Sequence, residues 1–233
     1  MKTMKTIGLL GGMSWESTAL YYREINQGVK RELGKLHSAR IVMVSVDFQE
    51  IEDLQQSGDW NRAGEVLAES AQQLEAAGAD FLVICTNTMH KVAPQIEAAV
   101  GIPLLHIADA TAEAIKEQGI RTIGLLGTKF TMEQDFYAGR LSDKHGLRVL
   151  IPEETDREVV HRVIYDELVL GVVREKSRTE LLRIMKQMKT KGAGGIILGC
   201  TEIGMLVQQE HTDIPLFDTT VIHAGKAVER ALT

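Results

Sequence analysis

Two short stretches of this chain place a cysteine and a threonine directly after an apolar run. They read FLVICTNTMHK at residues 81–91 and GGIILGCTEIGML at residues 194–206, and they hold Cys85 and Cys200, the chain's two cysteines. A thiol has a reference pKa of about 8.5, which the start of a helix can lower, so it can take and return a proton near neutral pH. Two such groups on opposite faces of a carbon with an acidic proton would invert that carbon.

The groups that follow each cysteine supply donors for a carboxylate. Asn87, Thr88 and Thr201 stand at expected helix starts, where backbone N–H groups are free to bind an anion. Met13 and Ser14 follow a glycine pair at another strand-to-helix turn, where the backbone can approach a ligand. These features suggest a two-base racemase or epimerase that uses no cofactor and acts on a small carboxylate. The seven histidines show no spacing such as His-Glu-x-x-His, so no metal is expected.

The chain contains an internal repeat. The hexapeptide TIGLLG occurs at residues 6–11 and again, unchanged, at residues 122–127. Each copy is followed by a helical region, a cysteine-bearing stretch and an apolar run that opens with Ile-Pro. Three signals in the same order predict two homologous halves, 1–118 and 119–233.

Each half alternates strands rich in Ile, Leu and Val with helical patterns, as in parallel sheets built from βαβ units. The expected strands are 5–10, 40–46, 80–85, 102–106, 121–126, 147–151, 194–199 and 214–217. The expected helices are 15–32, 60–77, 90–99, 110–118, 132–145, 155–170, 176–191 and 220–231. Asp59 and Thr155 are expected N-caps, and Gly78 is an expected C-terminal stop. The predicted fold class is α/β.

Ligands bind outside the carboxyl ends of the strands in open parallel sheets, so the polar groups after each strand are the site candidates. These groups lie in segments 11–14, 47–50, 85–88, 127–129 and 200–202. If the two halves face each other across a cleft, segment 85–88 looks across a bound ligand at segment 200–202.

Three motifs of the chain match a known family: GLLGGMS at residues 8–14, TNTMH at 86–90 and GCTE at 199–202. They resemble the aspartate/glutamate racemase family, in particular its enterobacterial amino-acid racemases, along the whole chain. The resemblance implies two similar α/β/α domains with parallel sheets, related by a pseudo-twofold, with the active site in the interdomain cleft. The implied domains are 1–105 plus 208–233, and 106–207. A homodimer and a reaction on a small amino acid (aspartate, glutamate or a relative), without pyridoxal phosphate or metal, are also implied.

The chain departs from the family pattern at its first motif, which usually reads Cys-Asn-Thr. Thr86 holds the place of that cysteine, and Cys85 lies one residue earlier. Because side chains alternate between the faces of a strand, this shift points the thiol away from the site. The repeat argues the opposite, since Cys85-Thr86 matches Cys200-Thr201 as an identical dipeptide. The family register makes Thr86 the group at the substrate and Cys85 a packing residue.

A pair made of one threonine and one cysteine implies unequal chemistry. A hydroxyl is a much weaker acid than a thiol and needs an activating partner to act as a base. In the family the second cysteine acts on the L-isomer, so Cys200 is the expected base for that isomer, with Thr86 opposite it. The L-amino acid should therefore lose its α-proton readily, and the D-isomer slowly.

Five further polar residues stand near the expected strand ends. Glu202 either caps its helix or binds the substrate's amino group, and its position in the family favours binding. Thr128 is either a turn residue or a substrate contact. Glu50 and Glu167 are either surface carboxylates or part of the cleft lining, and His90 either polarises the site or makes a structural hydrogen bond.

Recognition of the substrate's side chain is a second departure. Archaeal-type aspartate racemases hold the side-chain carboxylate with an arginine and a lysine. The matching segments here, 47–50 and 165–170, contain no cation. Since Arg and Lys dominate carboxylate recognition, an acidic side chain must rely on neutral donors, or the substrate is a neutral amino acid.

Composition argues against several other classes. A net charge of -6 and a pI near 5.7 argue against nucleic-acid binding. No apolar run approaches the length of a transmembrane helix, and two cysteines in apolar strands suit the reducing cytoplasm. Gly8, Gly11 and Gly12 lack the G-x-G-x-x-G spacing of a dinucleotide site. The alternatives are a decarboxylase or isomerase of the same superfamily and a ligand-binding module with impaired catalysis.

Overall fold

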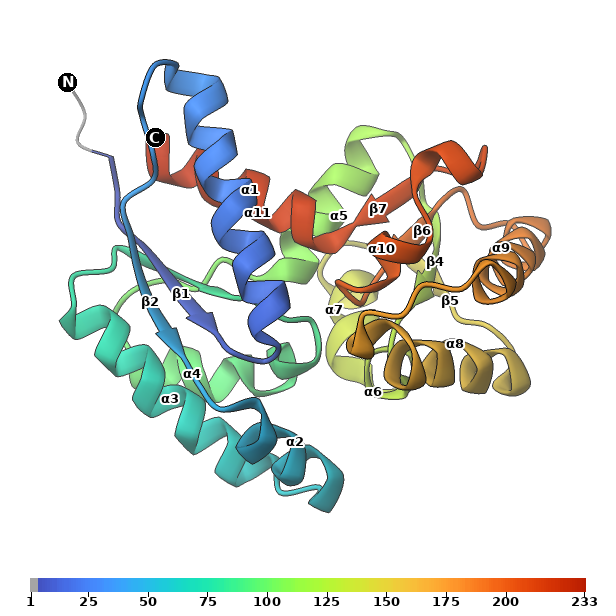
Figure 1. Ribbon diagram of the computed structural model, residues 1–233, viewed down its shortest axis with the longest axis horizontal. Helices are drawn as coiled ribbons and strands as arrows, with labels where there is room; N and C mark the ends of the chain where they lie inside the picture. The colour runs from blue at the N-terminus through green and yellow to red at the C-terminus, as the bar shows by residue number, and fades with distance from the viewer. Residues whose placement is uncertain (1–3) are drawn as a thin grey trace. The chain divides into compact units, whose positions relative to one another are not determined.

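The computed structural model describes residues 4–233 and divides the chain into two compact units. Unit 1 runs to Ile107 and takes up the chain again over Thr220–Thr233, whereas unit 2 comprises Ala108–Thr219. Both units combine helices with a parallel sheet (Figure 1), which confirms the predicted fold class. The chain passes between the units after residues 107 and 219, whereas the expected boundaries followed residues 105 and 207.

Unit 1 is built on a sheet of three parallel strands in the order β2-β1-β3. Its elements are β1 (Ile7–Gly11), α1 (Trp15–Leu33), β2 (Ile41–Ser45), α2 (Phe48–Ser57), α3 (Trp60–Ala76), β3 (Phe81–Ile84), the 3-10 helix η1 (Thr88–Val92), α4 (Ala93–Ala99) and the C-terminal α11 (Thr219–Leu232). Odd-numbered residues of β1 and β3 pack with α1 and α11, and even-numbered apolar ones pack with α2, α3 and α4. The period of two along each strand therefore makes two cores, one on each face of the sheet.

Local chemistry sets the helix ends of unit 1. Ser14, Asp47 and Asp59 each accept a backbone N–H at the start of α1, α2 and α3, as side chains at N-caps do. Gly58, with φ 75°, ends α2, and Gly78, with φ 89°, follows the end of α3. The cap at Asp59 and the stop at Gly78 are as predicted, but α2 was not predicted.

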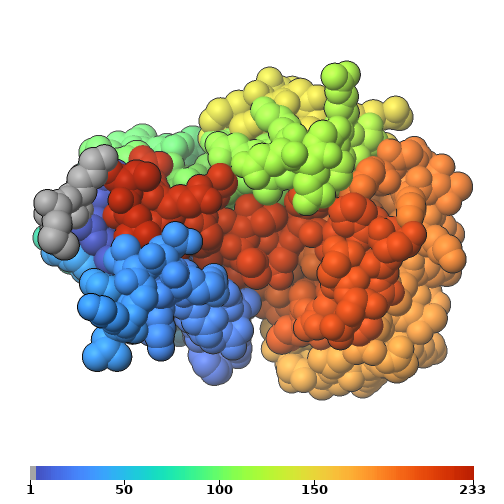
Figure 2. Space-filling model, turned by 90° about the horizontal axis from the view of Figure 1, so that it is seen from above, coloured from blue at the N-terminus to red at the C-terminus, as the bar shows by residue number. Residues whose placement is uncertain are grey.

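The C-terminal helix completes unit 1. Figures 1 and 2 show the red α11 lying beside the blue α1. The two helices meet where Val228 packs on Gly28, because a Cβ at Gly28 would lie 2.8 Å from the Val228 side chain. A hydrogen bond of 2.9 Å from the Lys5 N–H to the Ala231 carbonyl ties the end of the chain to the segment before β1.

Unit 2 is built on four parallel strands in the order β5-β4-β6-β7. Its elements are α5 (Ile107–Glu117), β4 (Thr122–Leu126), α6 (Lys129–Glu133), α7 (Asp135–Asp143), β5 (Arg148–Leu150), α8 (Glu154–Asp166), η2 (Leu168–Leu170), α9 (Glu175–Thr190), β6 (Ile196–Leu198), α10 (Ile203–Leu206), η3 (Gln209–His211) and β7 (Leu216–Asp218). Apolar residues of α8, α9 and α10 form one core with β4 and β6. Because β7 pairs with β6, the returning segment begins at Thr220 rather than at residue 208.

Two of the predicted elements are shortened or interrupted in the structure. The strand expected at 102–106 is a single bridge between Leu82 and Leu104, next to Pro103, which has no N–H to donate. The helix expected at 132–145 is broken into α6 and α7 by the extended backbone of Gln134, with ψ 147°.

The predicted N-cap at Thr155 is wrong. The helix starts at Glu154 with Glu153 as its N-cap residue, so Thr155 lies inside the first turn of α8.

Within residues 4–233, no helix is long and apolar enough to cross a bilayer.

Candidate active site

The repeated hexapeptide allows the two cysteine-bearing strand ends to be compared residue by residue. Its last leucine is Leu10 in β1 and Leu126 in β4. Leu10 pairs with Ile84 of β3, and Leu126 pairs with Leu198 of β6. Ile84 and Leu198 are therefore equivalent positions in the two units.

The next residue along each partner strand keeps this equivalence. The N–H of Cys85 donates to the Leu10 carbonyl at 2.9 Å, and the N–H of Gly199 donates to the Leu126 carbonyl at 2.6 Å. Cys85 thus corresponds to Gly199, and Thr86 corresponds to Cys200. The identical Cys-Thr dipeptides are out of register with each other by one residue.

Cys85 lies in the core of unit 1. Its side chain is 0% exposed and packs in the cluster formed by α1, α11 and the odd-numbered residues of β1 and β3. Burial raises the pKa of the Cys85 thiol far above its ordinary value, so the thiol stays protonated. Thr86 is partly exposed, and its hydroxyl pairs with no atom among the residues that the structure describes.

Hydrogen bonds hold the backbone on both sides of Thr86. The Ser17 hydroxyl donates to the carbonyl of Cys85 at 2.8 Å. The Ile107 N–H can only donate, so it fixes Nε2 of His90 as an acceptor at 3.2 Å. Nδ1 of the neutral ring then carries the proton and donates to the Thr86 carbonyl at 2.8 Å. His90 therefore makes the structural hydrogen bond, which was one of the two roles considered for it.

His90 belongs to a buried cluster of three histidines that sequence reasoning missed. Its ring centroid lies 4.5 Å from that of His106 and 5.9 Å from that of His223. Nε2 of His223 donates to the Leu105 carbonyl at 2.8 Å, and Nδ1 accepts from the Tyr21 hydroxyl at 2.8 Å. Burial lowers the pKa of His223 to about 4. The described part of the chain has no group of side chains arranged to hold a metal.

The internal sequence repeat contained a signal for this histidine cluster. The two Ile-Pro runs read IPLLH and IPLFD, so His106 and Asp218 take the same place at the ends of equivalent runs. A polar residue that ends an apolar run in both halves is a candidate for a structural role.

The turn after β1 uses its side chains to fix its own backbone. Gly12 has φ 94°, and a Cβ there would lie 2.2 Å from the carbonyl oxygen of Val46. The Thr18 hydroxyl accepts from the Gly12 N–H at 2.8 Å and donates to the Ser14 carbonyl at 2.9 Å. Ser14 caps α1, and Met13 is buried in the core beside α2 and α3. At these two predicted positions the side chains therefore serve the fold, which leaves the backbone as the part that can meet a ligand.

The thiol at the end of β6 has a different environment. Cys200 is partly exposed, and its Sγ donates to Oε2 of Glu202 at 2.9 Å. The Thr201 hydroxyl donates to the same oxygen at 2.6 Å. Burial and the neighbouring Glu202 carboxylate raise the pKa of Cys200, because both disfavour the negatively charged thiolate. Glu202 also stands at the N-cap position of α10, although its side chain makes no capping hydrogen bond there.

The end of β4 lies directly beside the end of β6. A Cβ on Gly127 would lie 3.1 Å from the Gly199 carbonyl oxygen, so the two strand ends approach closely. The next residue, Thr128, is buried, and its hydroxyl accepts from the Thr131 N–H at 3.3 Å to cap α6. The turn role considered for Thr128 is thus present, next to Cys200.

The remaining candidates are placed as follows. Asn87 is buried at 3% exposure, whereas Thr88 is partly exposed at the start of η1. Glu50 is exposed in the first turn of α2. Glu167 accepts from the Ser177 hydroxyl at 2.6 Å and pairs with Arg174 at 3.5 Å. The Glu167 carboxylate therefore fastens the segment between α8 and α9.

A family model described as Asp/Glu/hydantoin racemase matches residues 10–227. The chain belongs to this racemase family. It is 59% identical to a candidate Asp/Glu racemase from Yersinia pestis, with 99% of this chain and 100% of that chain covered and a TM-score of 0.94. An aspartate racemase homologue from Pyrococcus horikoshii is 35% identical, with 99% and 100% covered and a TM-score of 0.86. The broad specificity amino-acid racemase RacX from Bacillus subtilis is 22% identical over 181 residues, which are 75% of this chain and 74% of RacX.

The residues expected from the racemase family fall into two groups, one in each unit. In unit 1 the first turn of α1, which follows the turn after β1, touches segment 85–88, because Ser17 bonds to the Cys85 carbonyl. In unit 2, Thr128 lies at the strand end next to Cys200, Thr201 and Glu202. Glu167 is joined to α9 by its hydrogen bond instead.

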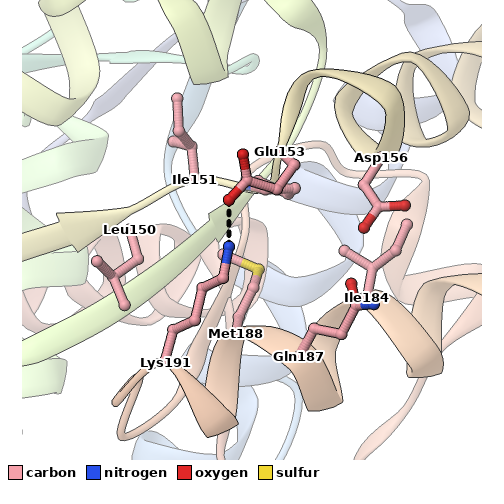
Figure 3. Close-up of a pocket in the computed structure, with 9 residues that line it drawn as sticks. Leu150, Ile151, Glu153, Asp156, Ile184, Gln187, Met188 and Lys191 are labelled. Carbon is pink, nitrogen blue, oxygen red and sulfur yellow. Dashed lines mark hydrogen bonds and ion pairs between the residues drawn. The ribbon is translucent and has the colours of Figure 1, made fainter.

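A surface pocket of this racemase-family protein lies away from these groups. Figure 3 shows it between the segment after β5 and the end of α9, where Glu153 pairs with Lys191. None of the predicted site residues lines this pocket.

Proposed function

We propose that the chain is an amino-acid racemase that uses no cofactor, with Cys200 and Thr86 acting at the α-carbon of one substrate. The observation that carries this proposal is the strand register, in which Thr86 and not Cys85 is the counterpart of Cys200. Equivalent positions in two homologous halves are the ones that a pseudo-twofold axis would bring to opposite faces of a ligand. The buried thiol of Cys85 has no part in the reaction.

In the proposed reaction Cys200 is the base for the L-isomer. The thiol loses its proton to water to form a thiolate. The Glu202 carboxylate, 2.9 Å from Sγ, opposes this negative charge until the substrate's ammonium group neutralises it. The thiolate then takes the α-proton, so the Cα–H bond breaks and its electron pair delocalises into the substrate carboxylate. Asn87, Thr88 and Thr201 bind that carboxylate, and Glu202 also receives the substrate's ammonium group.

Thr86 completes the inversion from the opposite face. Its hydroxyl gives a proton to Cα, which forms the D-isomer, and the resulting alkoxide regains a proton from water. A hydroxyl without an activating partner is a poor base, and Thr86 has none among residues 4–233. Proton removal from the D-isomer is therefore slow, so the L-isomer should exchange its α-hydrogen with solvent much faster than it is inverted.

The proposed substrates are small amino acids, with aspartate, glutamate and their relatives first. The names of the Yersinia and Pyrococcus proteins point to acidic amino acids, and that of RacX points to a broad range. Segment 47–50 contains no lysine or arginine that could hold an acidic side chain of the substrate.

The test is exchange of the α-hydrogen in heavy water, followed by NMR for the L- and D-isomers of glutamate and aspartate. We expect fast exchange from the L-isomer and slow exchange from the D-isomer. Equal rates would contradict the unequal roles of Cys200 and Thr86. Absence of exchange from both isomers, with binding retained, would favour a ligand-binding module instead.

A further inference from the structure

The imidazole of His161 is attached to the strand end that lies next to Cys200. His161 belongs to α8, and its Nδ1 lies 3.4 Å from the backbone N of Lys129, the first residue of α6. Its ring also packs on the ring of Tyr165, one helical turn further, with centroids 4.6 Å apart. Two independent contacts therefore fix the position and the plane of this half-buried ring.

The hydrogen bond to Lys129 also fixes the proton on the ring. A backbone N–H can only donate, so Nδ1 is the acceptor and the neutral imidazole carries its proton on Nε2. Burial, followed by the nearby charge of Lys129, lowers the pKa of His161, so the ring is neutral near pH 7. Nε2–H has no hydrogen-bond partner anywhere in residues 4–233.

The backbone that His161 contacts follows the strand end next to Cys200. Lys129 follows Thr128 at the end of β4, and β4 is the direct neighbour of β6 through the pair Leu126 and Leu198. Adjacent strands lie about 4.8 Å apart, and Cys200 comes two residues after that pair. The Nε2–H of His161 is thus a fixed neutral donor at the same edge of the sheet as Cys200.

We propose that Nε2–H of His161 binds a side-chain oxygen of the amino-acid substrate, which makes His161 a specificity-determining residue. The inference rests on the proposed function and names its substrate class: amino acids whose side chain ends in an acceptor oxygen. Two cations nearby are already paired, Lys129 with Glu158 at 3.5 Å and Arg157 with Glu133 at 2.8 Å. A neutral N–H can donate to a carboxylate oxygen as well as to a carboxamide or hydroxyl oxygen, which is compatible with a range of polar substrates.

The test compares L-glutamate with L-norvaline, which has the same carbon chain and a methyl group in place of the carboxylate. In His161→Asn the amide oxygen can still accept from the Lys129 N–H, but no donor reaches the position of Nε2. In His161→Gln the side-chain amide nitrogen takes the place of Nε2. The control is Arg162→Gln, at the exposed neighbouring position on α8.

The measured quantity is the ratio of kcat/KM for glutamate to that for norvaline, together with the ratio of their Kd values from calorimetry. We expect both ratios to move toward norvaline by about tenfold in His161→Asn, the size of one hydrogen bond to a charged group, and to stay near wild type in His161→Gln and in the control. Equal losses for both ligands, or unchanged ratios in His161→Asn, would overturn the inference. The Kd ratio also separates the two proposals, because it tests His161 even if the protein exchanges no α-hydrogen.

Discussion

The ends of β3 and β6 carry the same dipeptide, Cys-Thr, but expose different members of it. Cys85 is buried between the sheet of unit 1 and α1 with α11, whereas Cys200 is partly exposed and bonded to Glu202. The difference is one residue of register, because a shift of one residue moves a side chain to the other face of a strand. Identical dipeptides in two homologous halves therefore do not establish identical roles, and the hydrogen-bond register is the better guide.

The two strand ends also differ in the groups that surround them. The backbone at Thr86 is held by a neutral histidine that belongs to a buried cluster. The thiol of Cys200 lies against a carboxylate. One strand end thus presents a hydroxyl on a fixed backbone, and the other presents a thiol that is hydrogen-bonded to a carboxylate.

Replacing each cysteine in turn should give the largest contrast. In Cys200→Ala, α-hydrogen exchange from the L-isomer should fall by about 10²- to 10⁴-fold, the usual contribution of one acid–base group. In Cys85→Ala, exchange should change little, while the free energy of unfolding should fall by about 1 kcal/mol because a buried contact is lost. NMR exchange rates and urea denaturation measure the two effects. Loss of exchange in Cys85→Ala at near-wild-type stability would reverse the assignment.

Thr86→Cys should make the two strand ends chemically alike. A thiol at this position can act as a base, so exchange from the D-isomer should rise by about 10²-fold toward the rate of the L-isomer. Thr86→Ser keeps a hydroxyl and should keep the slow rate of the wild-type protein. The measurement is NMR exchange from the D-isomer, and an unchanged slow rate in Thr86→Cys would argue against a role for position 86.

The histidine cluster behind the end of β3 should make stability depend on pH. The pKa of His223 is about 4 in the folded protein and 6.5 for an ordinary histidine. The unfolded chain therefore binds more protons between these values, and stability should fall on the order of 3 kcal/mol as pH decreases through this window. Urea denaturation at a series of pH values measures the loss.

His223→Gln is the matched variant for this prediction. Its amide can still donate to the Leu105 carbonyl but does not titrate. The loss of stability between pH 6.5 and about 4 should therefore be smaller in this variant than in the wild-type protein. Equal losses would assign the pH dependence to other groups.

The smallest of these expected effects is the shift in the titration of the Cys200 thiol in Glu202→Gln. Removing the carboxylate removes one cause of the raised pKa of Cys200, so the thiolate should form at lower pH. The rate of alkylation by iodoacetamide, followed by mass spectrometry of the peptide that contains Cys200, should reach its midpoint at lower pH than in the wild-type protein. The peptide with Cys85 is the internal control, because a buried thiol should stay unmodified in the folded protein. A midpoint that does not move would show that burial alone raises this pKa.

Much of the fold could be predicted from local patterns. The alternation of strands and helices, the parallel sheets and the caps at Asp59 and Gly78 follow from periodicity and from single-residue chemistry. The helix α2 was not predicted, although Asp47 and Gly58 delimit it. The strand expected at 102–106 and the helix expected at 132–145 were wrong in extent, because pairing partners and helix breaks depend on contacts that are distant in sequence.

The candidate site, like the fold, could be predicted only in part from the sequence. Its segments could be listed from the chain, since polar residues after apolar runs lie at strand ends. The side chains that serve the fold could not be separated from those available to a ligand. Ser14 and Thr128 resemble Thr86 in sequence, but the first two cap helices, whereas the Thr86 hydroxyl has no partner within residues 4–233.

The sequence by itself determined which residue types stand at the strand ends, and through the repeated hexapeptide it determined that the two halves are related. Only the tertiary structure decided that Thr86 corresponds to Cys200, that Cys85 is core, and that His161 lies at the end of β4. The physical reason is that hydrogen bonds between strands and helices far apart in the chain set register and orientation. A local pattern specifies that a residue ends a strand, but these long-range bonds specify which face it occupies and what it meets there.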